Sequence, residues 1–202
     1  MSNKDFKIIG LTGQSGAGKS TITEVFESYG VKAVDADTLA HMALKTEKCK
    51  ENLQKAFGES IFDENGEVVR KALAKLAFTD KESTELLNKC THPVIAELSK
   101  EAFKKAEIEG FKAVVFDAPT LFESGLHSMC SEVVSVIAEK ELRAKRIMSR
   151  DNLTYDEAML RLNAQYPDSF YTDKSDYTIE NNSTADELRE KAHQVCKELF
   201  ND

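Results

Sequence analysis

A glycine-rich stretch near the N-terminus has the residue types and the spacing of a phosphate-binding loop. Residues 13–20 read Gly-Gln-Ser-Gly-Ala-Gly-Lys-Ser and fit the pattern G-x-x-x-x-G-K-[ST], which follows a strand and opens a helix. Glycines let backbone N–H groups close around phosphate oxygens, and the N-terminus of the next helix attracts the same anion. Lys19 would reach the β- and γ-phosphates, and Ser20 would ligate Mg²⁺. The alternative is an ordinary glycine-rich turn.

Two aspartates follow the second apolar run, in the sequence Val34-Asp35-Ala36-Asp37. Carboxylates at the carboxyl end of a strand in an open α/β sheet face the crevice where ligands bind. A carboxylate there could accept the proton of an attacking hydroxyl during phosphoryl transfer. The alternative is that Asp37 only caps a helix that begins at Thr38.

A third aspartate, Asp117, ends a run of four apolar residues, Ala113 to Phe116. The pattern is typical of a Walker-B strand, whose acid helps to hold Mg²⁺ directly or through water. A buried strand can also end in an aspartate because a turn follows it.

Four of the six arginines fall within one helical stretch of 19 residues: Arg143, Arg146, Arg150 and Arg161. Spacings of three and four predict that the first three share one face of a helix, as a fork array suited to triphosphate oxygens. The alternative is a solvated face on which acidic neighbours such as Asp151 form ion pairs.

The elements that must position these residues alternate between short apolar runs and helical patterns. Strands are predicted at 6–11, 31–34, 113–116, 133–137 and 177–179. This alternation predicts an α/β fold with a parallel sheet and helices on both faces. About 75 residues of helical periodicity separate the second and third runs, too many for one crossover helix, and predict a helical insertion. A 3–4 spacing from Leu188 to Leu199 predicts an amphipathic C-terminal helix.

Composition narrows the functional class. The 202 residues, 41% hydrophobic and 31% charged, suit one soluble globular domain with a small insertion. With 27 basic and 35 acidic residues, the net charge of -8 argues against nucleic-acid binding. No apolar run is long enough for a membrane span, and no signal peptide is evident.

The four cysteines are widely spaced and predict reduced thiols rather than zinc ligands or disulfides. A cytoplasmic location is expected, and the oligomeric state stays open.

Four segments in order along the chain resemble one family. They are Ile9–Gly13 leading into the loop, Val34–Asp37, His92–Ile95 and Asp117–Glu123, and together they resemble dephospho-CoA kinases. The resemblance implies a P-loop kinase fold: a core at about 1–40, 110–140 and 174–202, an inserted helical CoA-binding part at about 41–109, and a helical lid at about 141–173. It also implies transfer of the γ-phosphate of ATP to the 3′-hydroxyl of the dephospho-CoA ribose, the last step of coenzyme A synthesis.

The same resemblance assigns roles to individual residues. Asp37 would be the catalytic base, aided by Lys19 and Arg146. Dephospho-CoA would be bound by Asp37, Arg70, His92 and Asp117, and Mg²⁺ by Ser20 and Asp117. Asp176 would lie in the segment that closes around the adenine of ATP. The ATP-binding set would be Gly13, Gln14, Ser15, Gly16, Ala17, Gly18, Lys19, Ser20, Thr21, Arg146, Arg150 and Asn181.

The chain departs from the family pattern at three places. It has Val68-Val69-Arg70 where Leu-Asp-Arg is usual, Pro119-Thr120-Leu121 where Pro-Leu-Leu is usual, and Arg143 where Gln is common. None of these removes a group that the chemistry needs. His92, before Pro93, has the alternative role of capping the helix that follows.

Two other functions are compatible with the loop. A nucleoside monophosphate kinase would share the loop, the Mg²⁺ site and an arginine-rich lid, but its phosphate acceptor would need arginine clamps, and Arg70 is the single arginine of the inserted segment. A nucleotide switch would show Asn-Lys-x-Asp for guanine, and the nearest string, Asn88-Lys89-Cys90-Thr91, lacks the final Asp. A hydroxyl acceptor is therefore favoured.

Overall fold

The computed structural model describes residues 6–200 and contains a five-stranded sheet. Its strands are β1 (Lys7–Gly13), β2 (Val31–Asp35), β3 (Ala113–Asp117), β4 (Glu132–Ile137) and β5 (Tyr177–Glu180), in the order β2-β3-β1-β4-β5. β1 pairs in parallel with β3 and with β4, and β4 pairs in parallel with β5. The five predicted strands and the parallel α/β class are confirmed.

Nine helices of four residues or more join these strands within the described part of the chain, apart from short 3₁₀ turns. They are α1 (Lys19–Ser28), α2 (Ala36–Ala43), α3 (Glu47–Phe57), α4 (Arg70–Ala77), α5 (Lys81–Ile108), α6 (Lys140–Asp151), α7 (Tyr155–Asn163), α8 (Asp168–Thr172) and α9 (Ala185–Phe200). The segment between β2 and β3 is helical, as its periodicity predicts. The chain divides into two compact units, residues 6–34 with 105–200, hereafter the sheet unit, and residues 35–104, the helical unit.

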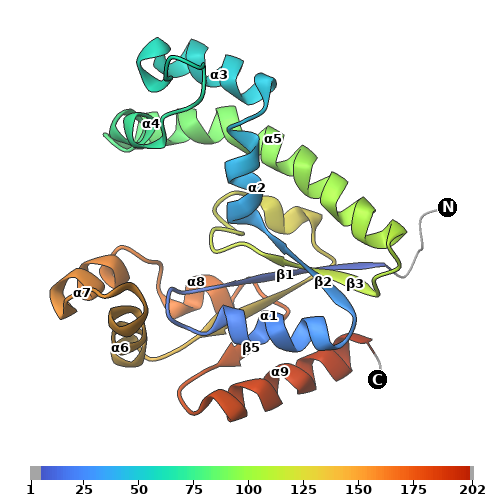
Figure 1. Ribbon diagram of the computed structural model, residues 1–202. Coiled ribbons are helices and arrows are strands. Elements are labelled where there is room, and N and C mark those ends of the chain that lie inside the picture. Colours follow the sequence, from blue (N-terminus) through green and yellow to red (C-terminus); the bar gives the residue numbers. More distant parts are fainter. Residues whose placement is uncertain (1–5, 201–202) are drawn as a thin grey trace. The chain divides into compact units, whose positions relative to one another are not determined.

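One face of the sheet is covered by α1 and α9, which lie side by side in Figure 1. Phe26 of α1 and Leu199 of α9 join Leu11 and Val134 of the central strands in one buried cluster. Burying a large apolar side chain contributes about 1.5–3 kcal/mol, and this cluster fixes the strand that leads into the glycine-rich loop. The predicted amphipathic C-terminal helix is confirmed.

The segment that contains α6 and α7 has a small core of its own. Ala144 and Ile147 of α6 pack with Ala158 and Leu162 of α7. A capping box starts α7, because the Thr154 hydroxyl accepts from the Glu157 N–H while the Glu157 carboxylate accepts from the Thr154 N–H. Such a box satisfies two N–H groups that a helix start would leave unpaired.

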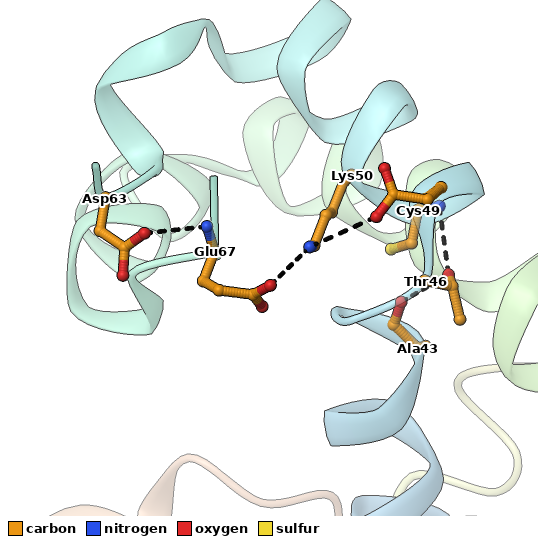
Figure 2. Close-up of polar contacts among 7 residues, drawn as sticks. Ala43, Thr46, Cys49, Lys50, Asp63 and Glu67 are labelled. Carbon is orange, nitrogen blue, oxygen red and sulfur yellow. Dashed lines mark hydrogen bonds and ion pairs between the residues drawn. The ribbon is translucent and has the colours of Figure 1, made fainter. Parts of the chain in front are cut away.

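The helical unit is held by polar contacts around α3 (Figure 2). Thr46 caps this helix: its Oγ1 accepts from the Cys49 N–H at 3.3 Å and donates to the Ala43 carbonyl at 2.8 Å. Lys50 Nζ donates to Glu67 Oε1 at 2.7 Å, and this hydrogen bond raises the pKa of Lys50. Asp63 in turn accepts from the Glu67 N–H at 2.9 Å, so α3 and the turn that precedes α4 are tied together.

The long helix α5 begins well before its proline. It runs continuously from Lys81 to Ile108 with Pro93 inside, so His92 lies in mid-helix and the interpretation of His92 as a cap is wrong. Pro93 lacks the N–H that would form the usual hydrogen bond within the helix.

No helix among residues 6–200 is long and apolar enough to span a bilayer.

All four cysteines are free thiols. Burial raises the pKa of Cys49 to about 11, and the pKa values of Cys130 and Cys196 to about 12. A thiol with such a pKa stays protonated at neutral pH and is a weak nucleophile.

The start of β5 depends on Asp176. Its N–H donates to the Val133 carbonyl at 2.9 Å, and its Oδ2 accepts from the Val133 N–H at 2.8 Å. The pair of contacts anchors β5 to β4, so the structure gives Asp176 a fold-stabilising contact in the segment expected near the adenine.

We expect Asp176→Ala to lower the free energy of unfolding by about 1.5–3 kcal/mol, because a charge-assisted hydrogen bond is lost and the Val133 N–H is left unpaired. Chemical denaturation would measure the change. Asp173→Ala, at an exposed acid three residues earlier, should stay within about 0.5 kcal/mol of the parent. Equal effects of the two variants would contradict the anchoring role of Asp176.

Candidate active site

The glycine-rich loop joins β1 to α1 in the sheet unit, as predicted. Gly13 ends β1 with φ at 143°, and a Cβ on it would lie 2.2 Å from the Val136 carbonyl oxygen. Gly18 precedes α1 with φ at 113°, and a Cβ there would lie 2.6 Å from Asn181 Nδ2. Both positions need glycine, because a side chain would meet backbone or a buried amide and because φ is positive. The strand–loop–helix arrangement is that of an anion-binding site.

The second half of the loop is held by Asn181 and Arg146. Asn181, 4% exposed, donates from Nδ2 to the Ala17 carbonyl at 2.6 Å. Arg146 Nη1 donates to the carbonyls of Gly16 and Asn181, at 3.3 and 3.2 Å, and its Nη2 donates to Asn181 Oδ1 at 3.3 Å. These two side chains satisfy the carbonyls of Gly16 and Ala17, and the Gln14 carbonyl accepts from the Ala17 N–H at 3.1 Å. Both residues expected in the ATP site are thus brought to the loop.

The first half of the loop is held by Gln14. This side chain is 2% exposed, and its Nε2 donates to Asp168 Oδ1 at 2.7 Å and to the Tyr166 carbonyl at 3.2 Å. The sequence predicts Gln14 as a loop residue but gives no signal for its link to residues 166–168, which lie more than 150 positions away.

Arg143 does not join the expected array of phosphate-binding arginines. It is buried, with Nε donating to the Ala138 carbonyl at 2.8 Å and Nη1 to Gln165 Oε1 at 3.0 Å. Burial lowers the pKa of Arg143, and the nearby Asp168 carboxylate opposes that change. The prediction that all three arginines present their guanidinium groups to phosphate is wrong for Arg143. Its side chain lies on the side of α6 that packs against the protein.

Arg150 and Arg161 share one carboxylate. Arg150 binds Asp151 through Nε and Nη2 at 2.7 and 2.8 Å, and Arg161 Nη1 binds the same carboxylate at 2.7 Å. Exposed pairs of this kind contribute little stability, so Arg150 can exchange Asp151 for another anion at small cost.

Asp117 ends β3 beside the loop. Its strand position is opposite Leu11 of β1, and its Oδ1 lies 4.0 Å from Lys19 Nζ. The Walker-B interpretation placed a carboxylate at this edge, and the structure brings it to the loop lysine. Ser20, the next residue of α1, is exposed.

In the helical unit, Asp35 and not Asp37 caps α2. Asp35 Oδ1 accepts from the Asp37 N–H at 2.9 Å, and Oδ2 accepts from the Thr38 hydroxyl at 2.8 Å. The interpretation of Asp37 as the cap is therefore wrong. The Asp37 side chain is exposed and, within residues 6–200, makes no hydrogen bond or ion pair, so its carboxylate is available to a ligand.

Asp37 lies on the face of α2 that borders a groove. Ala40, His41 and Leu44, at spacings of three, four and seven from Asp37, line a groove of about 650 Å³ together with residues of α4 and α5. Its other lining residues are Arg70, Lys71, Leu73, Ala74, Phe78, Leu87, Thr91 and Ile95. The groove is mainly apolar, with two cations at the start of α4.

His92 does not line this groove, although its neighbour Thr91 does. Burial lowers the pKa of His92, so its imidazole is neutral at physiological pH. A neutral imidazole can donate or accept a hydrogen bond.

The protein has the three parts of a P-loop kinase. They are the parallel sheet, the glycine-rich loop, and Asp117 at the end of β3, the strand beside β1. A family model described as dephospho-CoA kinase matches residues 7–187, so the chain belongs to the dephospho-CoA kinase family. The resemblance found in four sequence segments is confirmed.

Individual relatives agree with this assignment. A dephospho-CoA kinase of Corynebacterium glutamicum is 37% identical over 95% of this chain and 96% of its own length. Among solved structures, the Thermus thermophilus protein TT1252 superposes with a TM-score of 0.81 at 31% identity, covering 98% of this chain and all of that one. A dephospho-CoA kinase from Campylobacter jejuni gives 0.69 at 28% identity, over 95% and 96% of the two chains.

We expect Asn181→Ala to weaken the binding of ATP about tenfold, because the Ala17 carbonyl is left unpaired and Arg146 loses an acceptor, a cost of about 1–3 kcal/mol. Isothermal titration with ATP and Mg²⁺ would measure the dissociation constant. Asn182→Ala is the matched control, because Asn182 caps the start of α6 through the Glu139 N–H and does not contact the loop. An unchanged dissociation constant for Asn181→Ala would contradict the role of Asn181 in shaping the loop.

Proposed function

We propose that this protein transfers the γ-phosphate of ATP to the 3′-hydroxyl of the dephospho-CoA ribose, giving coenzyme A and ADP. The observation that carries the proposal is the free Asp37 carboxylate on the groove-lining face of α2, in a chain that also holds a phosphate-binding loop. Family membership along nearly the whole chain supports the same reaction.

The donor side of the proposal rests on the sheet unit. The N–H groups that are not paired inside the loop and the Lys19 ammonium would neutralise the β- and γ-phosphates. Arg146 mainly fixes the shape of the loop, because its guanidinium donates to the Gly16 carbonyl and to Asn181 Oδ1. Residues of about 141–173 are proposed to form a lid. Its Arg150 would exchange the Asp151 carboxylate for a phosphate oxygen of ATP.

The donor set at the loop fits Mg²⁺. A serine hydroxyl and one carboxylate, Ser20 and Asp117, are oxygen ligands of the kind that Mg²⁺ prefers, and Mg²⁺ sites of kinases complete their shell with water and substrate phosphates. No group of three or more metal-ligating side chains occurs within residues 6–200, which agrees with this sharing. The ion would supply charge neutralisation between the β- and γ-phosphates.

The acceptor side of the proposal rests on the helical unit. Arg70 and Lys71 offer two cations for the diphosphate of dephospho-CoA, while Leu73, Phe78 and Ile95 offer apolar surface for its long pantetheine arm. His92 of the same unit would act as a neutral hydrogen-bonding group. Asp117, of the sheet unit, is proposed as a further partner of the substrate. A single arginine in the groove does not suit a nucleoside monophosphate acceptor, whose phosphate needs a clamp of several arginines.

Asp37 would take the proton of the 3′-hydroxyl as the oxygen attacks the γ-phosphorus. A neutral hydroxyl needs such a base, and a carboxylate within hydrogen-bond reach supplies it.

The four free cysteines suit a reducing compartment, and we place the reaction in the cytoplasm.

The direct test compares acceptors. With ATP and Mg²⁺ present, ADP release should require dephospho-CoA and should be absent with AMP, with CMP or without acceptor, and mass spectrometry should show the gain of one phosphate on dephospho-CoA. Transfer to a monophosphate, or hydrolysis that ignores the acceptor, would overturn the substrate assignment.

We expect Asp37→Asn to lower kcat by 10² or more while the affinity for ATP stays the same, because a positioned general base contributes about 10²–10⁴ in rate. Asp35→Asn is the matched control, since asparagine also caps helices well, and it should keep kcat within about threefold. Steady-state kinetics would decide between them. Full activity of Asp37→Asn, or loss of activity in Asp35→Asn alone, would remove Asp37 from this role.

A further inference from the structure

An aromatic stack lies at the start of α8 in the sheet unit. The rings of Tyr166 and Phe170 are nearly parallel, at 13°, with centroids 4.0 Å apart. Lys174 Nζ lies over the Phe170 ring, 3.7 Å from its centroid. Since a cation and a ring at these distances cannot share one side of Phe170, both faces of Phe170 are covered. The face of the Tyr166 ring that points away from Phe170 is not covered by this stack, and the side chain is 49% exposed.

The stack is held firmly and is tied to the phosphate-binding loop. Phe170 packs edge-on against Phe122 and Tyr171, with centroids 6.0 and 5.3 Å away, an arrangement that aromatic pairs favour. The Tyr166 carbonyl accepts from Gln14 Nε2. The ring of Tyr166 is therefore a preorganised surface at a fixed distance from the first residues of the loop.

Tyr166 is among the residues that line a cavity of about 600 Å³, together with Gln14, Asn163, Gln165 and Asp168. Its size suits part of a small-molecule ligand. An aromatic face beside several polar side chains is the arrangement that binds a heteroaromatic base, with stacking on the face and hydrogen bonds along the edge.

The polar groups match the edge of adenine. Asn163 Oδ1 accepts from Lys140, and Gln165 Oε1 accepts from Arg143, so each amide keeps its NH₂ group for a ring nitrogen. Asp168 uses Oδ1 for Gln14 and keeps Oδ2 as an acceptor for an exocyclic amino group. Adenine presents ring-nitrogen acceptors and one amino donor, which is the complementary set.

The position of the cavity separates it from the site expected for the ATP base. The cavity reaches the loop at Gln14, whereas Asn181, expected near the ATP base, contacts the loop at the Ala17 carbonyl. The proposed reaction involves a second adenine, because the acceptor hydroxyl belongs to a ribose that itself carries adenine. That base must lie one sugar away from the transferred phosphate.

We infer that Tyr166 and the cavity beside it bind the adenine ring of the acceptor, which makes Tyr166 a specificity-determining residue. The inference rests on the proposed function, since it takes the acceptor to be dephospho-CoA.

The first experiment uses fluorescence. The chain has no tryptophan, so Tyr166→Trp provides a single reporter at the stack, and a base stacked on it should quench its emission. We expect quenching when dephospho-CoA is added to protein saturated with the β,γ-imido analogue of ATP and Mg²⁺, and little change when the analogue itself is added. Tyr155→Trp is the matched control, because Tyr155 is a lid tyrosine of similar exposure, 46%, outside the cavity.

The second experiment uses kinetics. Tyr166→Ala should raise KM for dephospho-CoA about 5- to 150-fold, the range that base–aromatic stacking of about 1–3 kcal/mol gives, with KM for ATP unchanged within twofold. Tyr166→Phe should restore KM, because it keeps the stacking face, and Tyr155→Ala should leave both constants unchanged.

The outcomes separate the two proposals. If the parent protein does not phosphorylate dephospho-CoA, the proposed function fails whatever the reporter shows. If it does, quenching by the ATP analogue, a rise in KM for ATP, or no response of either kind at position 166 would overturn the assignment of the cavity to the acceptor base.

Discussion

The structure depends on a conflict within the phosphate-binding loop. A backbone that turns its N–H groups toward an anion must turn its carbonyls the other way, into protein, where an unpaired carbonyl costs about 1–3 kcal/mol. Two side chains from distant parts of the chain, Asn181 and Arg146, donate to the carbonyls of Ala17 and Gly16. Because α6 and the residue after β5 supply these donors, the shape of the loop depends on how both elements pack beside it.

The sequence predicts what is local and leaves out what is distant. Five strands, the loop and the helical insertion follow from periodicity and from one motif, because hydrophobic patterning and glycine spacing are properties of neighbouring residues. The cap of α2 is also local, yet the alternative role considered for Asp37 places the cap at Asp37, whereas Asp35 holds it. The boundary of the helix was placed two residues late, and a cap moves with the boundary. The contacts of Gln14 with Asp168, across 154 positions, have no local signature at all.

The arginines show the same distinction in physical terms. Spacing places Arg143, Arg146 and Arg150 on neighbouring rows of α6, but spacing does not say which row faces the protein. Tertiary packing divides their roles: Arg143 is buried against the Ala138 carbonyl, Arg146 holds the loop, and Arg150 pairs with an exposed carboxylate. Of the three, Arg150 alone has a partner that a phosphate can replace cheaply, since an exposed ion pair contributes little, whereas uncovering the carbonyls that Arg146 satisfies has the cost of unpaired buried groups.

This division of roles bears on how a kinase avoids wasting ATP. Hydrolysis is prevented when water is excluded and when the catalytic groups are complete only with the acceptor in place. The loop of this chain is already shaped by Asn181, Arg146 and Gln14, so its donor site needs no substrate to form. Two further groups belong to segments outside the loop: the Asp37 carboxylate of the helical unit, which has no partner among residues 6–200, and Arg150 of α6, which pairs with the exposed Asp151. In the proposed reaction, the residues that shape the loop therefore differ from Asp37, the residue proposed to take the proton of the acceptor.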